Sequence, residues 1–80
     1  MKSIPWNDMA VLLVEAPGGR EIAAEGTLRQ MVNRIAARPP SEWHRFAISL
    51  PDRRVAPFAY ENDDVVVLVD AIRRGADQPR

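Results

Sequence analysis

The 80-residue chain contains no cysteine and only one histidine. The absence of cysteine excludes disulfides and thiolate metal sites, and a single histidine excludes a metal site built from several imidazoles. A chain of this length buries a core that contributes only a few kcal/mol net, so any extra stability has to come from packing or self-association. Lack of cysteine is compatible with a reducing compartment, and we expect a cytoplasmic protein.

Long hydrophobic runs are absent as well. The two longest, residues 9–14 and 65–69, are far too short to cross a bilayer, and the N-terminus lacks the regions of a secretory signal. With 46% hydrophobic and 28% charged residues, the composition is typical of a soluble globular domain. We therefore expect one domain over residues 1–80, with residues 1–8 as an N-terminal arm, 76–80 as a frayed tail, and no membrane segment.

The first part of the chain predicts a β-hairpin. Residues 9–16 are mostly apolar at both alternate positions, a Pro-Gly-Gly turn follows, and residues 20–24 form the shorter second strand. A short helix over residues 9–16 is the alternative, but the β-branched side chains of Val11 and Val14 favour a strand.

Residues 28–38 predict the first helix. Thr27 and Gln30 have the spacing of a capping box, and apolar residues recur from Leu28 at the spacing of one helix face. Basic residues near the end suit the negative pole of the helix, and the following Pro-Pro pair prevents its continuation.

A second pair of strands is expected in the next stretch. Residues 43–50 alternate between two faces, residues 51–54 predict a turn, and residues 55–60 form the partner strand. Pro57 has no backbone N–H to donate, so this strand is expected at a sheet edge or with a bulge.

Residues 63–74 predict the second helix. Acidic residues follow a capping Asn62, and basic residues precede Gly75, so both ends suit the helix dipole. The branched run 65–69 fits a buried strand equally well by pattern, and the end signals decide for the helix. The whole chain is then a ββαββα, α+β protein: a two-layer sandwich of a four-stranded, mainly antiparallel sheet with two helices on one face.

The apolar residues exceed what two layers can bury, because residues 11–14 are apolar on both faces of their strand and the second helix has valines beside its core stripe. One explanation is that the N-terminal arm folds back as a lid over the second sheet face. The other is that a second copy or a partner protein docks there. The candidate protein interface consists of Trp6, Leu12, Val14, Val66 and Val67.

The net charge is zero, but its distribution is uneven. Residues 29–54 carry +4, from six arginines against two acids, whereas residues 1–28 and 55–80 each carry −2. Arginines interleaved with aromatic residues are typical of proteins that bind single-stranded nucleic acid. The candidate anion or nucleic-acid contacts are Arg34, Arg38, Trp43, His44, Arg45, Arg53 and Arg54.

A structural interpretation of the same residues competes with this one. Arginines at a helix end or on a turn need no ligand, a tryptophan is more often a core residue than a stacking platform, and neutral overall charge disfavours strong phosphate binding.

The sequence contains few residues that could form a catalytic site. The glycine-rich turn lacks the lysine and further glycines of a phosphate-binding loop, and His44 with Ser41 or Ser49 is too small a set to define a triad. We therefore expect no enzyme, no cofactor and no metal. The predicted function is a small binding or accessory module that acts through protein contact or homodimerisation. The alternative is a nucleic-acid-binding module that uses residues 29–54.

Overall fold

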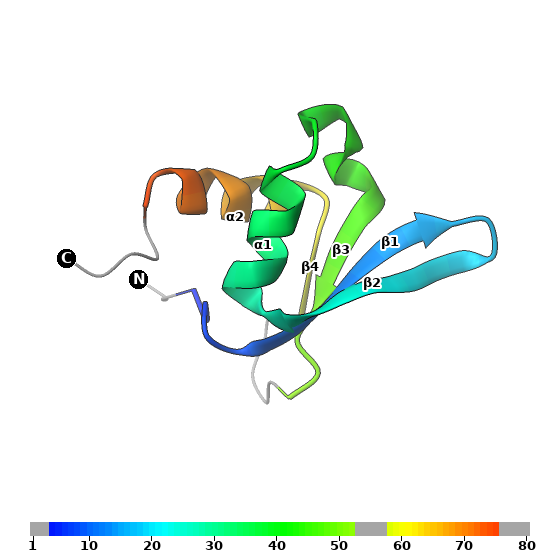
Figure 1. Cartoon of the computed structure of the whole chain (residues 1–80), viewed down its shortest axis with the longest axis horizontal. Helices are drawn as coiled ribbons and strands as arrows, with labels where there is room; N and C mark the ends of the chain where they lie inside the picture. The colour runs from blue at the N-terminus through cyan, green and yellow to red at the C-terminus, as the bar shows by residue number, and fades with distance from the viewer. Residues whose placement is uncertain (1–3, 53–57, 76–80) are drawn as a thin grey trace.

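The computed structural model describes residues 4–52 and 58–75 (Figure 1). Two strands and a helix are followed by a 3₁₀ helix, two further strands and a second helix. In chain order these are β1 (Met9–Ala16), β2 (Gly19–Thr27), α1 (Leu28–Ala36), η1 (Pro40–Arg45), β3 (Phe46–Ser49), β4 (Ala59–Glu61) and α2 (Asp63–Arg73). The predicted ββαββα order is confirmed, with η1 as an addition.

The four strands form one sheet in the order β2-β1-β3-β4, and every neighbouring pair is antiparallel. β1 pairs with β2 along its whole length but with β3 only through Val11–Val14. The far end of the β1–β2 hairpin therefore projects beyond the rest of the sheet (Figure 1).

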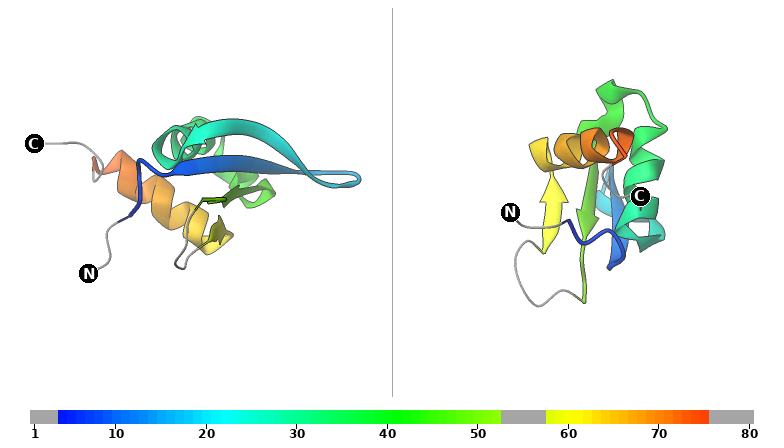
Figure 2. Two further views of the ribbon diagram at one scale, coloured as in Figure 1. Left: turned by 90° about the horizontal axis from the view of Figure 1, so that it is seen from below. Right: turned by 90° about the vertical axis from the view of Figure 1, so that its left-hand side faces the viewer.

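Both helices pack on one face of this sheet (Figure 2). Leu12, Ile48 and Tyr60 are cross-strand partners in one row, so their side chains share a face. All three belong to a single core cluster with Val32 of α1 and Val69 of α2. The predicted two-layer α+β sandwich is confirmed.

The start of α1 is fixed by the predicted capping box. The backbone N–H of Gln30 donates to Thr27 Oγ1 over 3.2 Å, and the Thr27 N–H donates to Gln30 Oε1 over 2.9 Å. These bonds satisfy donors that a helix N-terminus would otherwise leave without partners. The helix ends at Ala36, two residues before its predicted end at Arg38.

The N-terminal arm closes the helix side of the core. Trp6 is buried in the same cluster as both helices, its carbonyl accepts a bond from the Arg29 N–H at 3.0 Å, and the Asp8 carbonyl accepts one from the Leu28 N–H at 2.9 Å. The prediction that the arm covers the second sheet face is therefore wrong, because the arm is held at the start of α1.

The strand predicted over residues 43–50 is shorter than expected. Residues 43–45 belong to η1, where Pro40 occupies the first turn and the Trp43 side chain reaches back to the Arg38 carbonyl. Proline suits a helix start, and this tight turn overrides the alternating pattern at His44.

The partner strand predicted over residues 55–60 is observed as β4, Ala59–Glu61, at a sheet edge. Residues 55–57, including the bulge or edge position expected for Pro57, lie outside the described residues, as does the predicted tail over 76–80.

The second helix is confirmed over Asp63–Arg73, with acidic residues in its first turn and Arg73 in its last. The capping role of Asn62 is not observed, because its side chain makes no capping hydrogen bond and its backbone has a φ of 52°.

Candidate functional site

The sheet face opposite the helices carries its own row of apolar side chains. On β1 these are Val11 and Leu13, which alternate with the core residue Leu12. The partners that share this open face are Glu25 and Ile22 on β2, Ser49 and Ala47 on β3, and Ala59 and Glu61 on β4. In the part of the chain that the structure describes, neither helix packs on this face.

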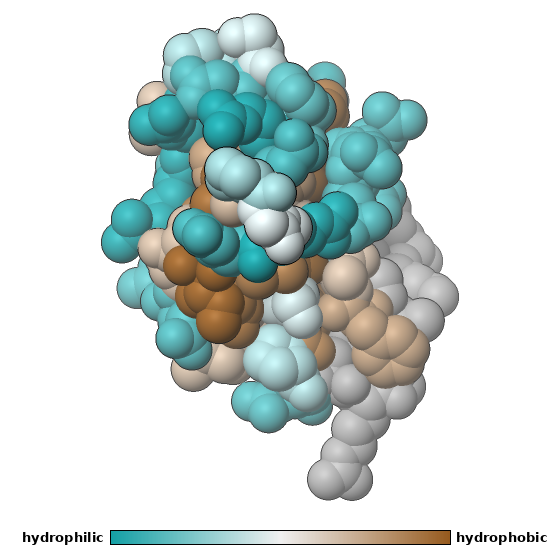
Figure 3. Space-filling view, turned by 90° about the vertical axis from the view of Figure 1, so that its right-hand side faces the viewer, coloured by the Kyte–Doolittle hydropathy of each residue, from teal (hydrophilic) through white to brown (hydrophobic). Residues whose placement is uncertain are grey.

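Exposure is uneven across the open face. Ile22 is 64% exposed and Met9 is 50% exposed, whereas Val11 and Leu13 are half-buried. Figure 3 looks from the hairpin side and shows hydrophobic side chains gathered below the hairpin tip, with hydrophilic ones around them. Monomeric proteins rarely expose large contiguous apolar patches without a functional reason, so this face is a candidate contact surface.

An ion pair crosses the open face from one edge strand to the other. Arg20 on β2 pairs with Glu61 on β4, and the two strands β1 and β3 lie between them. Ala47 lies on the same face beside Glu61 and is only 3% exposed, although it is not part of the helix-side core. The open face therefore carries an ion pair as well as apolar side chains.

A bulge in β2 sets which residues reach the open face. Leu12 pairs with Ala24, but Leu13 pairs with Ile22, so Ala23 is an extra residue in β2. The bulge brings Ile22 and Glu25 to the same face although their numbers differ in parity. A simple alternating pattern could not have assigned them together.

The candidate interface residues do not form one surface. Trp6 and Leu12 are buried in the core, so they cannot contact a partner in this fold. Val14 is half-buried and pairs with Phe46 on the helix side of the sheet. Only Val66 and Val67 of the predicted set are well exposed, on the outer surface of α2, and they lie away from the open sheet face.

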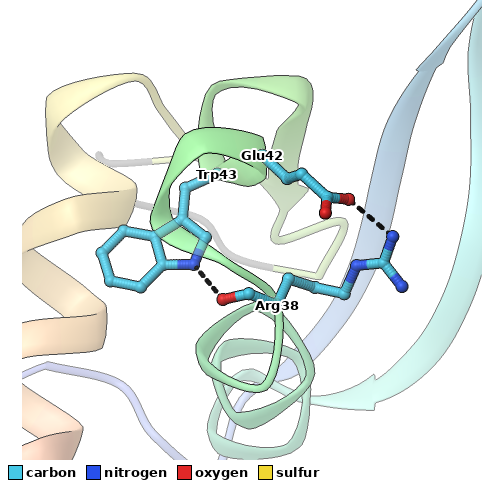
Figure 4. Close-up of polar contacts among 3 residues, drawn as sticks. All are labelled: Arg38, Glu42 and Trp43. Atoms are coloured by element: carbon cyan, nitrogen blue, oxygen red, sulfur yellow. Dashed lines mark hydrogen bonds and ion pairs between the residues drawn. The ribbon is translucent and has the colours of Figure 1, made fainter.

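Trp43, the tryptophan of the basic middle segment, is buried and held by its own chain. Its indole N–H donates to the Arg38 carbonyl over 3.0 Å, as Figure 4 shows, and the Arg73 guanidinium carbon lies 5.1 Å from its ring centroid. The side chain is buried, so Trp43 offers no face for stacking bases. The structural interpretation of this residue is supported.

The other candidate cations take different environments. Arg38 forms an ion pair of 2.6 Å with Glu42 (Figure 4), which neutralises part of its charge. His44 and Arg45 are exposed on η1. Arg53 and Arg54 lie outside the described residues, so the structure does not test their contribution.

Two hollows beside α1 were not anticipated from the sequence. One hollow of about 300 Å³ is lined by Leu12, Ala23, Arg34, Ala37, Arg38 and Phe46. A second, of about 450 Å³, is lined by Glu25, Gln30, Met31, Asn33 and Arg34. Arg34 of α1 lines both hollows. The first lies over β1 and β3 as well as beside Ala23, and the second lies beside Glu25 of β2. Which residues line these hollows depends on how α1 crosses the sheet, and no local sequence pattern predicts that crossing.

Among residues 4–52 and 58–75, no group of three or more histidine, cysteine or carboxylate side chains is arranged to hold a metal ion. No helix in the same ranges has the length and apolar character needed to cross a membrane.

No protein-family model matches this chain, and no significant match is found among curated proteins or solved structures. The functional argument therefore rests on the surfaces described above.

Proposed function

We propose that this protein is a small binding module rather than an enzyme, and that it acts by protein contact, associating with a second copy of itself through the open sheet face. The observation that carries this proposal is Ile22, a large aliphatic side chain 64% exposed at the centre of an edge strand beside the half-buried Val11 and Leu13. Burying such a side chain against a partner is favourable by about 1.5–3 kcal/mol.

The apolar side chains, rather than the charges, carry this proposal. Arg20 shares the face with Glu15, Glu25 and Glu61 and is already paired with Glu61 of its own chain. In a two-fold contact the same patch of each copy meets the other, so Ile22, Val11 and Leu13 of one copy can bury those of the second.

Sedimentation velocity across about 1–100 μM protein tests self-association, because a dimer's population depends on concentration. We expect a monomer–dimer equilibrium that Ile22→Glu shifts to monomer. Val67→Glu is the matched control, since it places the same charge on an equally exposed aliphatic residue of α2, away from the open face.

Two results contradict the proposal. A wild-type protein that stays monomeric throughout the range rules out self-association. A dimer that Val67→Glu dissociates and Ile22→Glu leaves intact places the contact on α2 instead.

A further inference from the structure

The apolar row of β1 on the open sheet face begins with a methionine. Met9 is the first residue of β1, and the core residues Ala10 and Leu12 alternate with Met9, Val11 and Leu13. Met9 therefore lies on the open face with Val11 and Leu13. Residues two apart on a strand lie about 6–7 Å from each other, so the Met9 side chain extends this apolar row by one position.

Met9 is accessible from solvent, whereas the other methionine that the structure describes is not. The Met9 side chain is 50% exposed, and Met31 is 1% exposed on the core side of α1. The Arg20–Glu61 ion pair leaves Met9 uncovered, because the strand register places both of its residues beside Leu13–Glu15, toward the other end of β1. Among the described methionines, Met9 is therefore the one that a dissolved oxidant reaches directly.

The thioether of Met9 reacts with peroxides, whereas Val11, Leu13 and Ile22 beside it carry no atom of comparable reactivity. A lone pair of Met9 Sδ attacks one oxygen of the peroxide, and the O–O bond breaks. The attacked oxygen stays on sulfur, and the other leaves as hydroxide, which takes up the proton of the transferred oxygen to give water. Sulfur is oxidised to the sulfoxide and the peroxide is reduced, so an apolar side chain becomes a polar one.

From this placement we infer that Met9 is an oxidation site that controls self-association. Oxidation of its sulfur by a peroxide weakens the contact between two copies, and enzymatic reduction of the sulfoxide restores the contact. The inference rests on the proposed contact through the open sheet face and adds a modification that regulates that contact.

The symmetry of the contact increases the effect. In a two-fold contact the same row of each copy enters the interface, so the Met9 side chains of both copies are buried there. A polar group that is buried without a hydrogen-bond partner costs free energy, and the sulfoxide oxygen is such a group among Val11, Leu13 and Ile22. Oxidation of both copies therefore opposes association at two places in one interface.

Site-resolved mass spectrometry tests the reactivity of Met9. Cleavage after lysine and arginine places the three methionines of the chain on different peptides, residues 1–2, 3–20 and 30–34. With hydrogen peroxide in excess, we expect Met9 to gain one oxygen about tenfold faster than Met31 or more, because the buried Met31 is reached only when the core opens.

Sedimentation velocity across about 1–100 μM protein measures the consequence for association. We expect the dissociation constant of the dimer to rise about tenfold or more when Met9 is oxidised. Treatment of the oxidised protein with both methionine sulfoxide reductases, each of which acts on one epimer of the sulfoxide, and with a dithiol as reductant should restore the original constant.

Two substitutions separate Met9 from every other target of the peroxide. Met9→Leu keeps the aliphatic bulk and removes the sulfur, so it should dimerise as the reduced wild type does, before and after peroxide treatment. Met9→Gln introduces a polar side chain without an oxidant and should dimerise about as weakly as the oxidised wild type. Equal thermal midpoints for the two variants show that the fold is intact.

The inference alone is overturned if Met9 and Met31 are oxidised at equal rates, or if a dimer persists unchanged after complete oxidation of Met9. Loss of the Met9→Leu dimer on peroxide treatment also overturns it, because another residue is then responsible. A reduced wild type that stays monomeric throughout the range overturns the proposed function, and the regulation by Met9 with it.

Discussion

Arg20 and Glu61 are 41 residues apart in the sequence and form an ion pair across the open face of the sheet, from one edge strand to the other. The pair joins the projecting hairpin to β4, which among the described strands is paired with β3 alone. It also lies on the face where Ala47 is buried outside the main core. The hairpin is therefore connected to the rest of the sheet by side chains as well as by its pairing with β3.

A double-mutant cycle of Arg20→Ala and Glu61→Ala should show a small, salt-sensitive coupling. The two side chains are 53% and 43% exposed, so water screens the pair and we expect less than about 1 kcal/mol. Urea unfolding of the four proteins measures the coupling, which should decrease at about 1 M salt. Additive effects of the two substitutions at low salt would contradict a stabilising pair.

Asn62→Gly should stabilise the protein. Asn62 has φ 52° and ψ −119°, a conformation that costs a residue with a Cβ about 1–3 kcal/mol and that glycine adopts readily, and its side chain makes no capping bond in return. We expect a gain of about 1 kcal/mol in the free energy of unfolding, measured by urea denaturation. Asn62→Ala is the control and should show no such gain, because alanine retains the Cβ.

Trp43 should behave as a core residue. Trp43→Ala should cost about 3–5 kcal/mol, a large part of the stability of a domain this small. Trp43→Phe keeps most of the apolar volume but leaves the Arg38 carbonyl without its indole donor, so about 1–3 kcal/mol is expected. Thermal unfolding measures the stability of both variants. A Trp43→Ala protein as stable as the wild type would show that Trp43 is not a core residue and could be a surface contact.

The elements that sequence analysis predicted best depend on neighbours close in the chain. The Thr27–Gln30 capping box spans three residues, and the hairpin turn is determined by its own glycines, so local chemistry was sufficient for both. The same local reasoning failed at His44, where Pro40 and the Trp43–Arg38 hydrogen bond convert an alternating pattern into a 3₁₀ helix.

The candidate surfaces could be predicted only in part. Residues 11–14 indicated two apolar strand faces, and the structure has two, but alternation alone does not say which face the helices cover. For this reason Leu12 was expected at an interface and lies in the core, whereas Leu13 lies on the open face. The Arg20–Glu61 pair and the hollows beside α1 depend on strand order and on how the helix crosses the sheet, which are long-range features.

Gly26 supports the capping box of α1 because it has no side chain. A Cβ at this position would collide with Gln30 Oε1, the atom that accepts the bond from the Thr27 N–H, and would lie 3.1 Å from Met31 Cε. Gly26→Ala must therefore displace the Gln30 side chain, and we expect a loss of about 1 kcal/mol, the usual cost of losing a cap.

A second substitution tests whether displacement of the Gln30 side chain causes the loss of stability in Gly26→Ala. Gln30→Ala removes both the acceptor and the obstacle, so the loss in the Gly26→Ala, Gln30→Ala double variant should be smaller than the sum of the two single losses. Gly18→Ala is the matched control, since a Cβ there meets nothing within 4 Å and should leave stability almost unchanged. Urea unfolding of the set measures these differences. Strictly additive losses at residues 26 and 30 would mean that the collision is relieved by movement of β2 or Met31 rather than by displacement of Gln30.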